Sequence, residues 1–330
     1  MKLFAGTSKG LFEIQRGRPH CLLKVKGVRE VVQLGNELFA GTSEGLYISS
    51  DQGASWKGPY LSEFAIWQIR GDKLGRIYVG THPAELFRSV DNGNTWQRLE
   101  SLGEIVKKEG WCIPLEPPIP SQARAIVIDA DNPDQLWVGV EVGGILHSVD
   151  GGASWSVGCP GDNPDLHMIF PHPEKEGVLF ASTGYGRLDG IAEMVEGNAG
   201  VFRSDDAGST WKYVWGGITP RYSRPMCIDQ TAPFPVTVAS APTAFSSFKD
   251  PQGAGAMLFR SDDEGVSWRS LCDDAHSPSA VNFHGLTPNP DSPGSVFVGT
   301  DNGELWNVDK EGCWELLAEN MPAVLSVMAG

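Results

Sequence analysis

Short apolar runs alternate with turn-forming residues along the whole chain, and the runs come in groups of four. In one group, runs at 124–129, 136–139 and 144–149 are followed, after a turn, by a run that begins at Trp155. Runs of this length, bounded by Gly, Pro, Asn and Asp, predict strands. We therefore expect each group to form a four-stranded antiparallel unit, with strands A to D in chain order.

One motif, Ser-x-Asp-x-Gly-x-Ser/Thr-Trp, marks the turn between strands C and D. It occurs five times, at Ser49–Trp56, Ser89–Trp96, Ser148–Trp155, Ser204–Trp211 and Ser261–Trp268. A degenerate copy at Asp309–Trp314 keeps the spacing from Asp to Trp but has its Gly at a different position. The Asp can accept hydrogen bonds from nearby backbone N–H groups, and the Gly can adopt a positive φ. The motif lacks the Asp-x-Asp-x-Asp-Gly run of a calcium loop. It predicts a hairpin corner whose Trp packs into the protein, and its role is structural.

Seven such units fill the chain. Each unit has a small residue at the end of strand B, and these residues are Gly6, Gly41, Gly80, Gly139, Ser182, Ala239 and Gly299. Seven four-stranded antiparallel units predict an all-β fold, a seven-bladed β-propeller that forms one domain over residues 1–330. The first unit lacks strand A, while residues 323–328 form a surplus strand. We expect this C-terminal strand to complete blade one (residues 1–26 plus 322–330) and to close the ring.

Composition narrows the range of partners. A formal net charge of −15 argues against nucleic acid and anionic membranes. No apolar run approaches the roughly 20 residues that cross a bilayer, and the first residues have the pattern of a strand rather than a signal peptide. The six cysteines show no metal-ligand spacing and no CxxC. We expect a cytoplasmic protein with reduced thiols and without a cofactor.

The repeated corner resembles the BNR/Asp-box repeat of sialidases, xyloglucanases and sortilin-type receptors. Over nearly its whole length the chain is similar to single-domain bacterial propellers that are often labelled glycosyl hydrolase-like. The resemblance implies the propeller fold. Sialidases, however, have six blades and an Arg-Ile-Pro motif that is absent here, and xyloglucanases resemble two propellers in tandem. No catalytic residue of those families can therefore be transferred to this sequence.

Departures from the repeat indicate the working face. Blades five and six carry long B–C connections at 183–199 and 240–254, and a third long segment, 101–122, precedes blade four. In a propeller these connections lie on the face opposite the Trp corners. Long loops on a rigid scaffold commonly carry function.

Strand A supplies the candidate chemistry. Alignment on the strand-B ends without gaps places Arg124, His167, Arg224 and His284 at one position, at the channel mouth of blades four to seven. Glu30 and Ala65 are the expected counterparts in blades two and three. Glu141 and Asp301 should lie across the A–B pair from Arg124 and His284, where ion pairs could form. The same count puts Gly184 and Ala241 opposite His167 and Arg224, which leaves these two side chains available to a ligand.

Further residues are expected to reach the same mouth: His82, Trp111, Tyr185, Arg187, Asp189, Arg221 and Tyr222. Arginine forks suit carboxylate or phosphate, and His167 or Glu141 could act as a general acid or base. No metal is expected, because the three histidines that could hold one, His82, His167 and His284, belong to separate blades.

Two functional interpretations remain open. In the first, the channel mouth over blades four to seven binds a small anionic or sugar-like ligand. The protein would then act as a hydrolase of glycosidase type or as a lyase, with Arg124 and Arg224 as an electrostatic clamp. In the second, the same loops form a non-catalytic scaffold for a protein or peptide partner, as in sortilin-type receptors.

Overall fold

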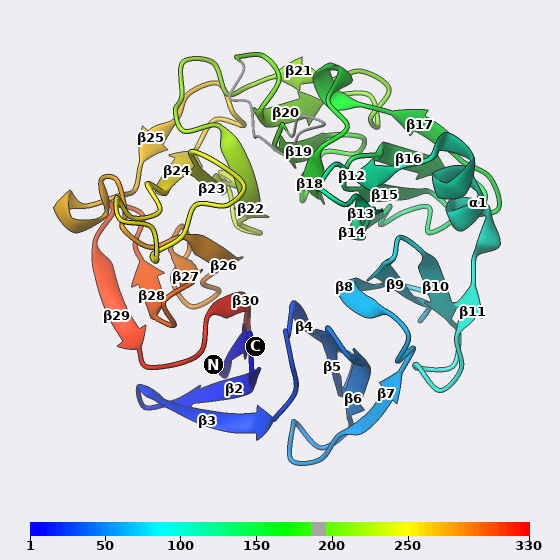
Figure 1. The fold of residues 1–330 in the computed structure, drawn as a ribbon, viewed down its shortest axis with the longest axis horizontal. Coiled ribbons are helices and arrows are strands. Elements are labelled where there is room, and N and C mark those ends of the chain that lie inside the picture. The colour runs from blue at the N-terminus through cyan, green and yellow to red at the C-terminus, as the bar shows by residue number, and fades with distance from the viewer. Residues whose placement is uncertain (186–195) are drawn as a thin grey trace.

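The computed structural model describes residues 1–185 and 196–330, and in it seven four-stranded antiparallel sheets surround a central channel (Figure 1). From the channel outward, blade one comprises β30 (Val324–Ala329), β1 (Leu3–Thr7), β2 (Gly10–Gln15) and β3 (Arg18–Leu23). Blade two comprises β4 (Glu30–Leu34), β5 (Glu37–Thr42), β6 (Gly45–Ser49) and β7 (Lys57–Tyr60), and blade three comprises β8 (Ala65–Gly71), β9 (Ile77–His82), β10 (Leu86–Ser89) and β11 (Gln97–Arg98). Blade four comprises β14 (Ala123–Ile128), β15 (Leu136–Val140), β16 (Gly144–Ser148) and β17 (Ser156–Gly158).

The remaining blades repeat this design. Blade five comprises β18 (Leu166–Pro171), β19 (Leu179–Thr183), β20 (Gly200–Ser204) and β21 (Lys212–Tyr213); blade six β22 (Tyr222–Ile228), β23 (Val236–Ala241), β24 (Met257–Ser261) and β25 (Arg269–Ser270); blade seven β26 (Phe283–Pro288), β27 (Val296–Thr300), β28 (Leu305–Val308) and β29 (Trp314–Ala318). The predicted seven-bladed propeller is confirmed.

The C-terminal strand closes the ring, as predicted. β30 pairs antiparallel with β1, with Ala5 opposite Val327 and Gly6 opposite Ser326. The two ends of the chain therefore meet in blade one, where Figure 1 shows the termini side by side. The Ser326 hydroxyl also donates to the carbonyl oxygen of Val28, at 3.2 Å, in the linker that leads into blade two.

In all five copies of the repeated corner the Ser and Asp side chains accept the same backbone hydrogen bonds, whereas the partner of the Trp indole varies. In the first, Asp51 Oδ1 accepts from the Ser55 N–H at 2.8 Å, and the Gly53 N–H donates to Ser49 Oγ at 2.8 Å. Gly53 has a φ of 92°, which favours glycine. Trp56 then donates its indole N–H to the Gly53 carbonyl at 3.2 Å. The turn satisfies its own aspartate, which explains the motif without a bound ion.

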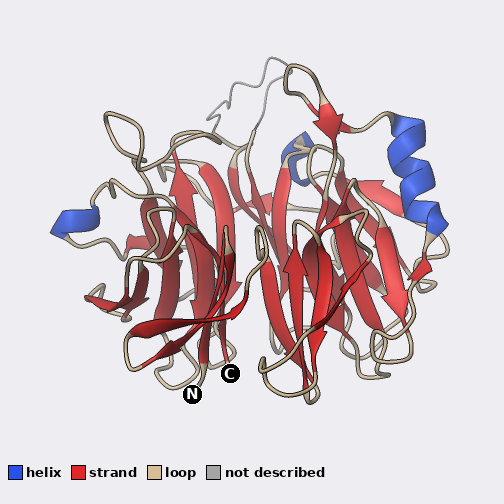
Figure 2. Ribbon diagram, turned by 60° about the horizontal axis from the view of Figure 1, so that its bottom comes forward, coloured by secondary structure: helices blue, strands red, loops and turns tan. Residues whose placement is uncertain are grey.

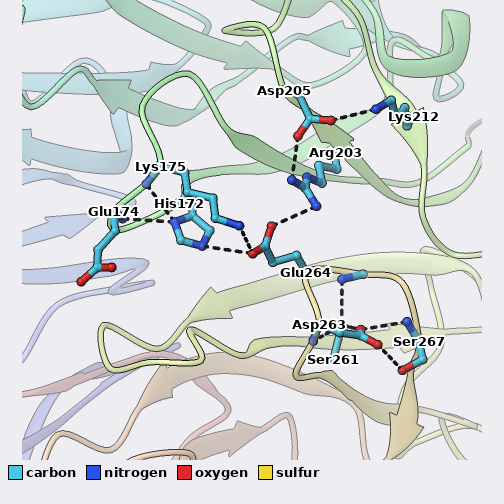
Figure 3. A network of polar contacts seen from close by, with 11 residues as sticks. His172, Glu174, Lys175, Arg203, Asp205, Lys212, Ser261, Asp263, Glu264 and Ser267 are labelled. Atoms are coloured by element: carbon cyan, nitrogen blue, oxygen red, sulfur yellow. Dashed lines mark hydrogen bonds and ion pairs between the residues drawn. The ribbon is translucent and has the colours of Figure 1, made fainter.

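Apolar clusters fill the spaces between neighbouring blades, and polar contacts supplement them at the outer side. Glu264, in the corner of blade six, accepts from Lys175 and from Arg203 Nη1 (3.0 Å), which both belong to blade five (Figure 3). His172 Nε2 lies 3.8 Å from the same carboxylate. This network joins blades five and six.

The segment before blade four has more regular structure than its sequence suggests. It forms α1 (Glu100–Glu109), followed by a small hairpin of β12 (Cys112–Ile113) and β13 (Ile119–Pro120). Leu102 of α1 is fully buried in the core of blades three and four, and Figure 2 shows the helix at the outer side of the wheel. Two single turns of 3-10 helix, Pro160–Asp162 and Asp274–His276, complete the elements. None of the described helices has both the length and the apolar character that a bilayer crossing requires.

Candidate functional site

An irregularity in the first strand of the blades defines a ring of residues around the channel. In six blades the pairing of strands A and B shifts at the same place, so that an extra residue is left out of the ladder. Such a β-bulge re-aims a side chain without breaking the sheet. In blade two the ladder begins at Glu30, and Arg29 takes the equivalent place, with its N–H bonded to the Gly41 carbonyl at 2.8 Å. We call these residues the bulge ring: Leu325, Arg29, Trp67, Arg124, His167, Arg224 and His284.

The alignment of blades four to seven agrees with this register, but the counterparts in blades two and three were wrong. Arg29 and Trp67 occupy the position for which Glu30 and Ala65 were predicted. The reason is the length of the A–B turn, which is seven residues in blades four to seven (129–135 in blade four) but five in blade three (72–76) and two in blade two (35–36). The count back from strand B that fits blade four therefore reaches Ala65 in blade three, two residues before Trp67. In blade two, Glu30 pairs with Gly41 within the ladder, one residue after Arg29.

Six members of the bulge ring, all except His167, line a cavity of about 700 Å³ in the central channel. Within the cavity, the guanidinium of Arg29 stacks on the indole of Trp67, with its Cζ 4.0 Å from the ring centroid. The Cζ of Arg124 lies 4.8 Å from the centroid of the Trp67 ring. Cation–π contacts of this kind hold guanidinium groups in place with their forks free to bind.

The cavity concentrates positive charge. Burial, and then the neighbouring guanidinium of Arg124, lowers the pKa of Arg29 to about 10. Burial, followed by the charges of three nearby arginines, lowers the pKa of His284 to about 4, so that its imidazole is neutral at pH 7. Because the arginines remain protonated, the cavity is a cationic site inside a protein whose overall charge is negative.

Three carboxylates line the same cavity: Asp229 accepts the backbone N–H of Gly294 at 2.7 Å, and the other two each pair with an arginine. Glu141 Oε2 lies 2.7 Å from Arg124 Nη1, which confirms the predicted pair. Glu30 lies 2.9 Å from Arg70 Nη1; burial raises the pKa of Glu30, and the charge of Arg70 opposes that shift. Arg29 and Arg224 form no ion pair with any described carboxylate, and Arg224 donates instead to the carbonyl of Ala244.

His167 lies behind the cavity wall rather than on it. Its side chain is 0% exposed, its Nδ1 is 2.6 Å from the Ser223 carbonyl oxygen, and its Nε2 is 3.3 Å from Asp165 Oδ1. The ring of Tyr222 packs against it at 4.8 Å between centroids. Asp165 was not found from the sequence, because it precedes strand A of blade five and has no counterpart in the repeat. The burial of His167 keeps it from touching a ligand in the cavity.

The remaining predicted residues are dispersed. Trp111 packs on Gly143 in the core of blades three and four, and Arg221 pairs with Glu196. Asp301 does not form the predicted pair with His284. Its carboxylate instead accepts the backbone N–H groups of Asn282 and Phe248, at 2.9 and 3.0 Å.

Two other predicted residues, His82 and Tyr185, are not among the residues that line the cavity. His82, at the end of β9, has its pKa lowered mainly by burial, and Tyr185 is half-buried beside the blade-five loop. Arg187 and Asp189 fall outside the described residues. Among the described residues, the cavity is thus lined mainly by strand A and the A–B turns, and the described parts of the long loops contribute little of its lining.

Comparison with known proteins connects this fold to carbohydrate enzymes. No protein-family model matches the chain. A xyloglucanase of Paenibacillus sp is 30% identical over 199 residues, which span 59% of this chain and 17% of the relative. A xyloglucanase of Hypocrea jecorina (strain QM6a) is 24% identical over 276 residues, 83% of this chain and 27% of the relative. The chain thus spans less than a third of the length of either relative.

Solved structures show the same relation at the level of fold. The GH74 xyloglucanase from Xanthomonas campestris superposes with a TM-score of 0.62 at 14% identity, over 96% of this chain and 47% of its own. The GH74 enzyme of Niastella koreensis gives 0.65 at 13% identity, over 95% and 46%. In fold, the chain is therefore a propeller similar to those of GH74 enzymes. YCF48 from Cyanidioschyzon merolae shares the propeller fold too, with a TM-score of 0.54 over 88% of both chains.

Proposed function

We propose that this propeller binds a small anionic ligand, such as an acidic sugar, in the cavity bounded by the bulge ring. We also assign the repeated corner to the BNR/Asp-box repeat and place the protein, with its six free cysteines, in the cytoplasm. One observation carries the ligand proposal: Arg29, Arg124 and Arg224 converge on one cavity, and of these three only Arg124 has a carboxylate partner among the described residues.

Electrostatics explains why an anion fits. Burial is the main cause of the lowered pKa of Arg29, and the like charges of Arg124 and Arg224 lower it further. A carboxylate or phosphate group in the cavity would relieve that repulsion and accept bidentate hydrogen bonds from the free guanidinium forks. A neutral His284 beside them can donate or accept a hydrogen bond from a hydroxyl group without adding charge. The lining therefore suits a ligand that carries both an acid group and hydroxyls.

The similarity to xyloglucanases supports a hydrolytic version of the proposal. Glycoside hydrolysis uses two carboxyl groups, one of which must be protonated to act as the acid. In this cavity Glu30, whose pKa is raised by burial, suits the acid role. Glu141, held by Arg124, suits the role of the ionised partner. His167, buried behind the wall, is not part of this pair.

Binding can be tested by calorimetric titration with glucuronate and with glucose. We expect glucuronate to bind and glucose to bind far more weakly. Because a hydrogen bond to a charged group contributes about 1.5–3 kcal/mol, Arg29→Gln should weaken glucuronate binding by roughly 10- to 100-fold. The exposed Arg18 on β3 provides the matched control, and Arg18→Gln should bind as the wild type does. Equal affinities for the two sugars, or an unchanged Arg29→Gln variant, would contradict the proposal.

Hydrolysis is tested separately with aryl glucuronides and xyloglucan oligosaccharides. Turnover that is lost in Glu30→Gln while glucuronate still binds supports the hydrolytic version. Binding without turnover of either substrate by the wild type leaves a ligand-binding propeller.

A protein or peptide partner is the second candidate, and one observation favours it. Phe245 and Phe248, in the blade-six loop, are 63% and 41% exposed, although the backbone of Phe248 is fixed by Asp301. Aromatic side chains held on a fixed loop are typical of binding surfaces. A cellular partner that is lost in the double variant Phe245→Ala, Phe248→Ala, but retained in Arg29→Gln, would favour this scaffold function.

A further inference from the structure

We propose that Glu141, Asp165 and His167 form a binding site for a divalent transition-metal ion at the wall of the cavity, with Glu141 on the cavity side and the other two residues behind it. One potential ligand atom from each residue lies within 4.8 Å of the other two, and all three residues are buried. They come from two neighbouring blades, because Glu141 follows β15 of blade four while Asp165 and His167 belong to the start of blade five. The inference does not depend on which ligand the cavity binds.

The orientation of His167 points to a metal ligand. A carbonyl oxygen can only accept, so the 2.6 Å contact with Ser223 places a proton on Nδ1. The other nitrogen, Nε2, is buried, faces the Asp165 carboxylate and makes no hydrogen bond of acceptable geometry. Metal-binding histidines commonly donate their second N–H to a backbone carbonyl, which fixes the tautomer that exposes the lone pair. His167 is held in that arrangement.

The two carboxylates are held close together, and Glu141 is also paired with Arg124 at 2.7 Å. The backbones of Glu141 and Asp165 face each other in an isolated antiparallel bridge. Among the described residues, His167 is the one side chain in polar contact with the buried carboxylate of Asp165. A buried carboxylate without hydrogen bonds is costly. A cation between these groups would satisfy Asp165 and Nε2 together.

Gly184 allows this approach. A Cβ atom there would lie 2.6 Å from Asp165 Oδ2 and 2.7 Å from His167 Cε1, so no larger residue fits beside the two ligands. The backbone N–H of Gly184 also donates to the Asp165 carbonyl at 2.9 Å. Blade five therefore keeps a small residue where the cluster needs close contact.

The donor set and the local charge define the ion. One imidazole nitrogen with two carboxylates suits Zn²⁺ or Mn²⁺, whereas Ca²⁺ and Mg²⁺ favour oxygen alone. The charges of Glu141 and Asp165 are balanced by those of the nearby Arg124 and Arg224, so that a bound divalent ion would make the local charge positive. The competing explanation is a second proton on His167, which would pair with Asp165 and leave no place for an ion.

The test uses the full chain, stripped with a chelator and then titrated with Mn²⁺ and with Zn²⁺ in separate calorimetric experiments. We expect one ion per chain. Asp165→Asn keeps the shape of the side chain and should weaken binding at least about tenfold, because even residues that only support a ligand contribute that much. Asp273, which contacts His276 at 2.6 Å elsewhere in the protein, gives the matched control, and Asp273→Asn should bind as the wild type does.

A second measurement needs no variant. Wild-type crystals soaked in Mn²⁺ should show an anomalous density peak between Glu141, Asp165 and His167. Absence of binding by the wild type, a peak elsewhere, or undiminished binding by a folded Asp165→Asn variant would each overturn the proposal. If Asp165→Asn does not fold, the anomalous map alone decides.

Discussion

Closure of the ring by the C-terminal strand makes a quantitative prediction at the seam between blades one and seven. Val324 of β30 is 0% exposed and packs in one cluster with Leu3, Phe297 and Leu305. Val324 packs directly on Gly299 of blade seven: a Cβ atom added to this glycine would lie only 2.3 Å from Val324 Cγ1. Val324→Ala removes two buried methyl groups from this seam.

The expected cost follows from burial. Two buried carbons contribute about 1.6 kcal/mol at roughly 0.8 kcal/mol each, and the remaining cavity raises the loss to about 2–3 kcal/mol. The same substitution at Val157 on β17, which is 48% exposed, should change the free energy of unfolding by less than about 0.5 kcal/mol. Val157→Ala is therefore the matched control.

The assay exploits the distribution of tryptophan. None of the 11 tryptophans lies in blade one (residues 1–26 and 322–330), so their fluorescence reports on blades two to seven. If closure couples all the blades, Val324→Ala should lower the urea midpoint by fluorescence and by far-ultraviolet circular dichroism to the same extent. An unchanged fluorescence midpoint would show that blade one opens independently and would refute the closure argument.

Two further predictions concern the polar contacts of the blades. Glu264→Gln removes the negative charge shared by Lys175 and Arg203. Because the lysine is exposed, we expect a loss of about 1 kcal/mol or less that shrinks with added salt, measured by urea unfolding with the exposed Glu63→Gln as control. Hydrogen bonds from Ser55 hold the pKa of Asp51 at about 2, and those from Ser154 do the same for Asp150. Their contribution is complete above the unfolded pKa of about 4 and is lost as the pH falls toward 2, so Asp51→Asn should flatten the acid side of a plot of urea midpoint against pH, and an unchanged slope would contradict this assignment.

The sequence carries the fold because each blade repeats its own local signals. The Ser, Asp and Gly of a corner interact within eight residues, as Ser49–Trp56 shows, so the motif predicts these hydrogen bonds wherever it recurs. The partner of the Trp indole varies between copies and is not predicted by the motif. Closure was predictable from an imbalance in the strand count. Helix α1 was not anticipated, because it lies in a non-repeated segment and is stabilised by burying Leu102 against two blades.

The candidate site was only partly predictable, since it depends on the spacing between strands. Arg124, Arg224 and His284 were found because blades four to seven share one turn length. Arg29 and Trp67 were missed because shorter turns precede strand B in their blades. Asp165 was missed because its proximity to Glu141 joins two blades, and no pattern within a single blade reports that contact.

The bulge explains how one wheel can hold such varied chemistry. At the bulge the strand keeps its ladder on both sides, while the extra residue is aimed at the channel. Packing between the blades therefore does not fix which amino acid occupies this position. The seven positions carry one leucine, one tryptophan, three arginines and two histidines. His167 differs from the others in being fully buried, and in its place Met168 contributes to the cavity lining. In blade five, therefore, the bulge residue His167 faces Asp165 and Glu141 instead of the cavity. This difference is expected if His167 binds a different ligand from the arginines of the bulge ring.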